Sequence, residues 1–498
     1  MPESKDVGTV AVATPEGVGA TDMIYQLGGK PPFRIAFPLG LQHVLTMFVG
    51  NLAPVLVLAG IVGAAGSTIM TPQETILMVQ CAMLVSGLTT LLQLYPIKIG
   101  KFQIGGGLPI VMGTSFVFVS ALVATLTEYG LAAVFGAIIV GGVMEIILGL
   151  FYRVLQRLFP PIVIGTVLMT IGLSLLPVGI QYLAGGAAAQ GALASSQALA
   201  ADGLQVPPEV AALAAQYGSW QNLLVGIVVF LVIVALQRWG RGFVKAMAIL
   251  GGIIVGYLLA IAFGMVDFSN LLANGFVSLP LPATVPAFHL GPIVTIGLLY
   301  IISGLETMGN VNGITVAAFD REATNKETSG AILADAVGSM VAGAFNCLPN
   351  TAFGQNAGIV AMTKVVNKWV VAMGAFVLIA AGFFPPIGAV FSAMPACVLG
   401  GAVISVFGMI LVNGIKLIVL NGLTERNILI LCITFGAGFA MSQTPALVAL
   451  FPEPLHFIFS ETTLAVCLVA VIANLLFKER GKEKDGAGKD ADPIEILG

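Results

Sequence analysis

Long apolar stretches recur along almost the whole chain and limit its fold more than any other feature of the sequence. A window of about 18 to 25 mostly apolar residues can cross the hydrocarbon core of a bilayer as a helix. Eleven such windows are clear, at 38–63, 75–96, 130–152, 159–183, 220–238, 243–266, 291–312, 369–390, 396–418, 426–445 and 459–477. Only 9% of the residues are charged, against about 25% in soluble domains. The chain is therefore predicted to be an all-α polytopic membrane protein.

Three weaker apolar segments raise the predicted number of transmembrane segments to fourteen. They lie at 103–125, 329–346 and 349–366, and Gly, Pro and polar residues interrupt each of them. We number the spans in chain order, so that the first and last of these segments are spans 3 and 10. The residues before 36 lack an apolar signal-peptide core, and the polar tail 479–498 is predicted to be disordered.

The positions of the basic residues support this count, because Lys and Arg concentrate in cytoplasmic loops. With a cytoplasmic N-terminus, every loop after an even-numbered span is basic, and residues in these loops include Lys98, Arg153, Arg157, Arg241, Arg321, Lys364 and Lys416. No Lys or Arg falls in a predicted outside loop, including the long Ala- and Gly-rich loop 184–219. The sequence therefore predicts a multi-pass protein of the cytoplasmic membrane with both termini in the cytoplasm.

Two pairs of short motifs indicate an internal repeat. FPPIVIG at 159–165 resembles MPACVLG at 394–400, and GLPIVMG at 107–113 resembles CLPNTAFG at 347–354. The offsets of 235 and 240 residues fit a repeat of seven spans. Since seven is odd, the two repeats would be inverted, and the broken spans 3 and 10 would correspond. Paired broken spans are the best sequence indication of a binding site near the membrane midplane.

Few ionisable side chains lie within the predicted spans, and the clear cases are His43, Glu145, Glu306 and Asp335. A carboxylate near the centre of a membrane helix is costly, so its default role is functional. We expect Glu306 to act on a ligand or a proton, and Asp335 to relay protons or brace the site. Glu145 lies toward the predicted cytoplasmic half of span 4, where a structural or snorkelling role is favoured, and a histidine such as His43 can equally be a helix–helix contact.

Gln355 and Asn356 lie side by side in the broken span 10. A primary amide offers both a hydrogen-bond donor and an acceptor, and a carboxylate such as Glu306 accepts N–H bonds strongly. Together these groups suit a planar heterocycle whose edge alternates C=O and N–H. An inorganic anion, in contrast, would be repelled by Glu306. From the residues alone, the prediction is a transporter for a small polar molecule.

The motif Gln355-Asn356-x-Gly358-x-x-x-x-Thr363-Lys364 resembles the signature of the nucleobase–ascorbate transporters, also called the nucleobase:cation symporters. Other motifs follow in the family's order, and the resemblance covers roughly residues 35–478. They are Gln42-His43, Gly107-Leu108-Pro109 leading to Thr114-Ser115-Phe116, then Glu306, and Leu333-Ala334-Asp335.

The resemblance implies fourteen spans in two inverted repeats of seven, with a core domain that carries substrate against a gate domain. A cytoplasmic N-terminal tail would occupy 1–35 and a disordered cytoplasmic tail 479–498. Core-domain spans 1–4 and 8–11 would lie at 36–158 and 269–392, and gate-domain spans 5–7 and 12–14 at 159–268 and 393–478.

The resemblance also implies roles for individual residues. Glu306 and Gln355 would bind substrate, with Ser115 and Phe116 as candidates in span 3 and Asn356 shaping the site. His43, Asp335 and the neighbouring Gln42 would form a polar network that takes part in proton coupling. Gln at position 355 resembles the xanthine and urate branch, whereas uracil-type members tend to carry Glu. Asn310 departs from members that have an acid there, which leaves its role open.

The sequence thus predicts a proton-coupled symporter that imports xanthine or uric acid and is expected to form a homodimer. The alternatives left open are a uracil permease, sodium in place of protons, and a carrier of inorganic anions with the same inverted-repeat architecture. A passive channel fits paired broken spans poorly. No metal, cofactor or nucleic acid is called for, and no sequence motif of an enzyme was found.

Overall fold

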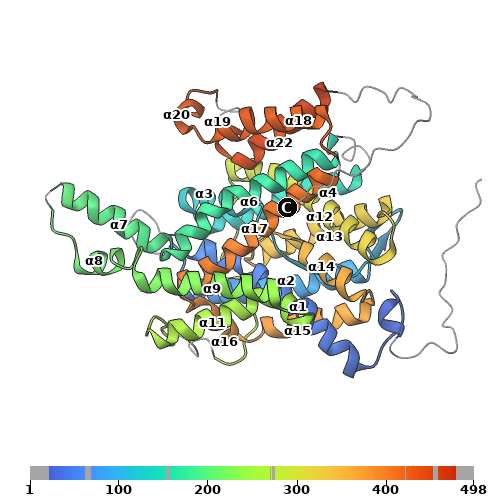
Figure 1. Ribbon diagram of the computed structural model, residues 1–498, viewed down its shortest axis with the longest axis horizontal. Coiled ribbons are helices and arrows are strands. Elements are labelled where there is room, and N and C mark those ends of the chain that lie inside the picture. The colour runs from blue at the N-terminus through green and yellow to red at the C-terminus, as the bar shows by residue number, and fades with distance from the viewer. Residues whose placement is uncertain are drawn as a thin grey trace, which may run out of the picture.

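The computed structural model describes residues 22–61, 69–152, 158–202, 204–269, 271, 275–420, 422–452 and 458–477. The predictions for the tail 479–498, for most of the N-terminal tail and for Arg153 and Arg157 lie outside these residues. Within the described residues the protein is mostly helical (Figure 1). Seven helices in this described part are long and apolar enough to cross a membrane, namely α1 (Phe33–Ala59), α2 (Pro72–Leu94), α4 (Leu131–Leu150), α6 (Pro161–Leu183), α9 (Trp220–Trp239), α12 (Leu290–Phe319) and α17 (Ala396–Leu420).

Other predicted spans are shorter or bent. The segment 369–390 forms α15 (Lys368–Gly382) and α16 (Pro385–Ser392), which meet at 81° where two consecutive prolines prevent a continuous helix. Shorter or less apolar helices occupy other predicted spans, namely α11 (Ala248–Ala262), α13 (Asn325–Ala344), α18 (Glu425–Ile433) and α22 (Thr462–Leu476). The structure thus supports a multi-pass helical membrane protein.

The Ala- and Gly-rich segment 184–219, predicted as a loop, contains two helices, α7 (Gly186–Ala201) and α8 (Pro208–Ala214). Alanine has the highest intrinsic helix propensity, which explains why this Ala-rich segment is helical. Figure 1 shows α7 and α8 extending away from the bundle. The remaining short helices are α10 (Phe243–Ala246), α19 (Ala440–Ser442) and α20 (Pro445–Val448), with single turns at Asp22–Tyr25 and Thr434–Phe439.

The broken spans 3 and 10 each consist of a short strand followed by a half-helix. In span 3, β3 (Met112–Thr114) precedes α3 (Val119–Tyr129), and in span 10, β4 (Asn350–Ala352) precedes α14 (Gly354–Thr363). A separate hairpin of β1 (Ile97–Ile99) and β2 (Phe102–Ile104) comes before span 3. Strands β3 and β4 pair antiparallel, with Gly113 opposite Thr351. The two predicted break points therefore meet in space and satisfy each other's backbone groups, as a buried non-helical segment requires.

Equivalent contacts recur in the two halves of the chain, as expected for an internal repeat. A Cβ on Gly165 of α6 would approach Ile418 of α17, and a Cβ on Gly400 of α17 would approach Leu183 of α6. Gly400 is equivalent to Gly165 and Ile418 to Leu183, each at the offset of 235 residues that the motif comparison gave. Figure 1 shows α6 and α17 side by side at the centre of the bundle, and their contacts extend along both helices.

The same symmetry appears at the start of α2 and α13. Thr71 and Glu74 form a capping box at the N-terminus of α2, and Thr324 and Glu327 form one at the N-terminus of α13. The sequences TPQET (71–75) and TNKET (324–328) encode these boxes, because each Thr caps a backbone N–H and each Glu accepts one in return. This third repeat match is visible in the sequence but was missed by the motif comparison.

The helices pack in two groups. One group holds α1, α2 and α15 together, and α4 packs on α12 and α13. The other holds α6 against α17, with α9, α11 and α22 beside them. The β3–β4 ribbon contacts α1, α2, α12 and α13, all of which belong to the first group.

Candidate functional site

A cavity lies where the β3–β4 ribbon and its two half-helices face α6, α12 and α17. Its lining residues come from the ribbon, the turn before α3, the start of α14 and helices α6, α12 and α17, and they are Thr114, Phe116, Leu168, Glu306, Asn310, Thr351, Ala352, Phe353, Gly354, Gln355, Ile410 and Asn413. Three of the residues predicted to bind substrate, Glu306, Gln355 and Phe116, are therefore brought together from α12, α14 and the turn before α3. The facing wall consists of Leu168 of α6 with Ile410 and Asn413 of α17.

The ribbon is held rigidly by side chains of neighbouring helices. Asn51 of α1 accepts the Thr114 N–H at 2.8 Å and the Ser86 hydroxyl at 2.9 Å. The side chain of Asn310 donates to the Ala352 carbonyl at 2.6 Å, and the Ser339 hydroxyl accepts the Asn350 N–H at 2.9 Å. Because these bonds fix both strands, the half-helices α3 and α14 begin at defined positions beside the cavity.

The arrangement presents both polar and aromatic surface to a ligand. Helix α14 begins at Gly354 next to the cavity, and the N-terminus of a helix carries N–H groups without intrahelical partners. Oε2 of Glu306 is buried and has no hydrogen-bond partner among the described residues. A buried carboxylate oxygen without a partner is costly, so this atom is a ready acceptor for a ligand N–H.

Two residues predicted at the site lie behind the cavity wall. The Ser115 hydroxyl accepts the Val117 N–H at 3.3 Å, and the Ser115 N–H donates to the Pro349 carbonyl at 2.8 Å. Ser115 therefore stabilises the turn between β3 and α3, and its neighbour Thr114 lines the cavity instead. Asn356 is buried, accepts from Nδ1 of His43 at 2.5 Å, and donates to the Pro109 carbonyl.

The predicted network residues occupy two different places. His43 and Asn356 join α1, α14 and the segment before β3, and Gln42 is buried beside His43 in α1. Asp335 of α13 instead contacts α12, where its Oδ2 accepts from the Thr307 hydroxyl at 2.5 Å. Neither His43 nor Asp335 lines the cavity.

The end of the signature motif anchors α14 rather than lining the cavity. The Thr363 hydroxyl donates to the Ile359 carbonyl, and the Lys364 ammonium donates to the Ala317 carbonyl at 2.7 Å. Ala317 lies in the last turn of α12, where carbonyls lack intrahelical partners and attract a cation. Gly358 faces open space, since a Cβ there would meet no atom within 4 Å.

Four polar lining residues were not predicted to bind substrate. In the ribbon, Thr114 lies opposite Asn350, and Thr351 lies opposite Gly113. Asn310 follows Glu306 by one helical turn, and Asn413 comes from α17. Asn413 was detectable in principle, because an amide within an apolar span is costly. Its alignment with Glu306 and Gln355, however, depends on the packing of α17.

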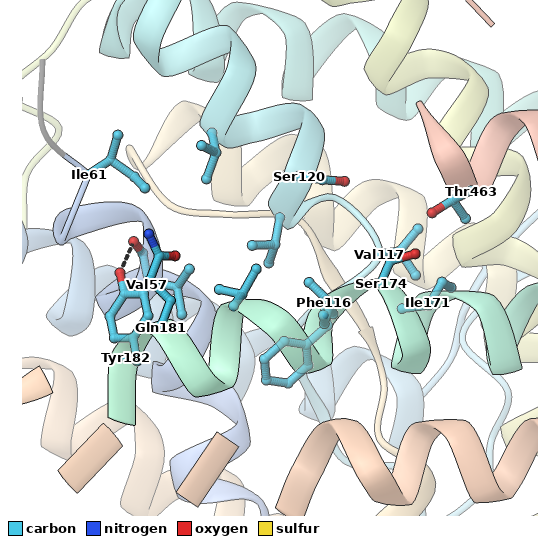
Figure 2. A pocket seen from close by; sticks show the side chains of 14 residues that line it. Val57, Ile61, Phe116, Val117, Ser120, Ile171, Ser174, Gln181, Tyr182 and Thr463 are labelled. Carbon is cyan, nitrogen blue, oxygen red and sulfur yellow. Dashed lines mark hydrogen bonds between the residues drawn. The ribbon is translucent and has the colours of Figure 1, made fainter. Parts of the chain in front are cut away.

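A second cavity adjoins the first and shares Phe116 with it (Figure 2). It is mainly apolar and lies between α1, α3, α6 and α22. The Tyr182 hydroxyl donates to the Val57 carbonyl at 2.6 Å at one end of it, as Figure 2 shows. The Phe116 ring packs edge-on against Phe407 of α17, with 5.4 Å between ring centroids. The Phe116 side chain is therefore part of the wall of both cavities.

Comparison with known proteins identifies relatives over most of the chain. The Permease family model (Xan_ur_permease) matches residues 34–208 and 208–447. The uric acid permease PucJ of Bacillus subtilis is 34% identical over 469 residues, which are 93% of this chain and 97% of that protein. The xanthine permease of the same organism is 31% identical, over 91% of this chain and 96% of that protein.

Solved structures with a similar fold are membrane transporters. The transmembrane domain of the cyanobacterial bicarbonate transporter BicA aligns with a TM-score of 0.52 and 15% identity, covering 89% of this chain and 98% of that one. The murine anion transporter Slc26a9 in its inward-facing state aligns with a TM-score of 0.55 and 12% identity, covering 90% of this chain and 70% of that one. These similarities concern the fold alone.

Proposed function

Since this chain belongs to the Permease family, the nucleobase–ascorbate transporters, we propose that it is a proton-coupled symporter that imports a purine base, xanthine or uric acid, across the cytoplasmic membrane. The names of its relatives, uric acid permease and xanthine permease, support the purine class. The chain is a permease and not an enzyme.

The observation that carries this proposal is the joint placement of Glu306 and Gln355 in one cavity with the Phe116 ring. The free oxygen of Glu306 accepts ring N–H groups, and the Gln355 amide both donates and accepts along the edge of an oxopurine. An aromatic ring stacks well on a flat heterocycle. A base that leaves one of these buried polar groups unpaired would be rejected, which is how such a site discriminates.

The packing of the helices supports alternating access. One wall of the cavity belongs to the group proposed as the core domain, with α12, α14 and the ribbon, and the other to α6 and α17 of the proposed gate domain. Movement of one group against the other would open the cavity to either side of the membrane. The proposed boundaries remain 36–158 and 269–392 for the core and 159–268 and 393–478 for the gate.

The coupled ion in this proposal is a proton held by Glu306 or Asp335. The Thr307 hydroxyl bonds to Asp335 and lies 3.3 Å from the Thr351 hydroxyl, which lines the cavity. Moving one charge through 100 mV supplies about 2.3 kcal/mol, enough for roughly 40-fold accumulation. We also propose that both termini lie in the cytoplasm and that the protein is a homodimer.

Uptake by cells that lack their own carriers tests the function. Labelled xanthine, urate and uracil are offered with and without an uncoupler to cells with wild-type protein, Glu306→Gln, or the surface control Glu128→Gln. We expect uncoupler-sensitive accumulation of one purine that Glu306→Gln abolishes and Glu128→Gln retains. Accumulation of uracil alone would overturn the purine assignment. Accumulation of no base by membrane-inserted protein would favour an inorganic-anion carrier, and equilibration without accumulation would indicate a passive channel.

A further inference from the structure

A buried carboxyl group outside the cavity has no role in the function proposed so far. Glu145 of α4 is fully buried, and neither of its side-chain oxygens has a hydrogen-bond partner among the described residues. Asp335 of α13 is also fully buried, and its Oδ1 likewise has no partner. The two carboxyl groups are close enough to hydrogen-bond to each other.

Among the described residues that surround the pair, none carries a positive charge to balance it. Helix α4 packs on α3, α12 and α13. The polar groups that face the pair are Ser303, Glu306 and Thr307 of α12 and Ser339 of α13, with the ring of Tyr300 nearby. The titratable groups of α3, Glu128 and Tyr129, lie at its exposed end. The ion pair that the structure shows within the described part of the chain joins Arg321 and Glu327, at the start of α13.

Two ionised carboxylates without a cation cannot share a buried site, because each charge would remain uncompensated in a medium of low dielectric constant. Two carboxylates are also acceptors only, so neither can satisfy the other. A single proton between them removes both problems, because the protonated group donates to the ionised one. Such a proton would lie between one of the unpartnered oxygens of Glu145 and Oδ1 of Asp335.

We propose that Glu145 and Asp335 form a carboxyl pair that shares one proton, and that Glu145 is a positioning residue for proton coupling. This role rests on the proposed symport function. Glu145 keeps the proton on Oδ1 of Asp335 while Oδ2 bonds to the Thr307 hydroxyl. Thr307 in turn reaches Thr351 at the cavity, so the protonation of the pair is transmitted to the site that contains Glu306.

Infrared spectroscopy of the purified full-length protein tests the pair independently of transport. Wild-type protein at neutral pH should show the C=O absorbance of a protonated carboxyl group. Glu145→Gln and Asp335→Asn should each lose the same part of it, because the new amide donates to the remaining acid and lets it ionise. The double variant should lose no more of this absorbance than either single variant. The control Glu128→Gln, which replaces an exposed carboxyl group, should lose none of it. An unchanged absorbance in Glu145→Gln would refute the shared proton.

Transport by reconstituted protein tests the coupling role. In Glu145→Gln we expect purine accumulation driven by a proton gradient to fall at least tenfold more than purine exchange without a gradient. The rate of gradient-driven uptake should also depend less on pH than in the wild type. Glu145→Asp should restore the pH dependence. Equal losses in both assays would show a merely structural role. If the wild type exchanges no purine, the proposed function fails, whereas the infrared result still decides whether the pair exists.

Discussion

His43 and Asn356 are 313 positions apart in the chain, yet Nδ1 of His43 donates to Oδ1 of Asn356 over 2.5 Å. The Asn356 amide then donates to the Pro109 carbonyl, so one side chain links α1, α14 and the segment before β3. Two of the conspicuous polar residues of the sequence therefore build the site without lining it. Gln355, the residue before Asn356, is the side chain of this motif that faces the cavity.

Replacing His43 by Leu is predicted to destabilise the protein. The Oδ1 of Asn356 would remain buried without a donor, which costs about 1–3 kcal/mol. Thermal unfolding of the purified protein in detergent should therefore occur at a lower temperature. His43→Gln, which restores a donor, should recover part of the loss. Equal stability of His43→Leu and wild type would contradict the structural role of this hydrogen bond.

Gln355→Glu is predicted to weaken purine transport at least tenfold. The change removes the amide donor and adds a second carboxylate to the cavity that holds Glu306, so a ligand acceptor is left unpaired and the two acids repel each other. Competition by unlabelled bases against labelled purine would measure the altered preference. Unaltered affinity and preference would show that position 355 does not contact the base. Asn413→Asp, on the opposite wall, provides the comparison for added charge alone.

Phe116→Ala is predicted to raise the KM for substrate and to join the two cavities. The ring lines the proposed binding cavity and packs edge-on against Phe407, a contact worth about 0.5–1.5 kcal/mol beyond area burial. Phe116→Tyr keeps the ring and should remain close to wild type. Initial rates of uptake over a range of concentrations would measure the KM. A similar KM in the Ala and Tyr variants would argue against an aromatic contact with substrate.

The capping box of α13 is predicted to make stability depend on pH. Glu327 precedes the predicted span and accepts both guanidinium nitrogens of Arg321, at 2.6 and 2.8 Å. Partial burial acts to raise the pKa of Glu327, but the bonds from Arg321 and Thr324 outweigh it and leave the pKa below its usual value. Since the folded state favours the ionised form, this stabilisation is present above the unfolded pKa of about 4.3 and is lost as the pH falls through the lower folded pKa.

Glu327→Ala should thus cost about 1–2 kcal/mol at neutral pH, from the lost cap and a partly exposed ion pair. Glu74→Ala removes the equivalent cap of α2, where the structure shows no such arginine contact among the described residues. The difference between the two variants in the loss of unfolding temperature measures the contribution of the Arg321 ion pair to stability. If acidification leaves the difference in unfolding temperature between Glu327→Ala and wild type unchanged, the ionised form of Glu327 does not contribute to stability.

Gly400→Ala is predicted to impair folding, whereas Gly408→Ala in the same helix should be tolerated. A Cβ on Gly400 would lie 2.1 Å from the backbone nitrogen of Leu183, but one on Gly408 would meet no atom within 4 Å. Forcing α6 and α17 apart costs at least the 1–3 kcal/mol typical of overpacking. The yield of monodisperse protein after gel filtration would compare the variants. Equal yields would contradict the close contact of the two helices.

The sequence alone determined the features that depend on the chain's interaction with the bilayer. Apolar length located the seven long apolar helices among the described residues, because the hydrocarbon core demands about 20 apolar residues for each helix. Gly and Pro located the breaks at spans 3 and 10, since only residues that break helices leave backbone groups free there. The cost of burying polar groups in lipid likewise identified Glu306 and Gln355 as candidate ligand-binding residues.

Tertiary structure alone decided which of these polar groups share a space. Ser115 and Thr114 are adjacent in the chain, but the pairing of β3 with β4 directs only Thr114 to the cavity. Asn413 joins the site because α17 packs on α6, and Glu145 lies beside Asp335 because α4 packs on α13. Such contacts depend on how the surfaces of helices far apart in the chain fit together. A local pattern of residues therefore does not predict them.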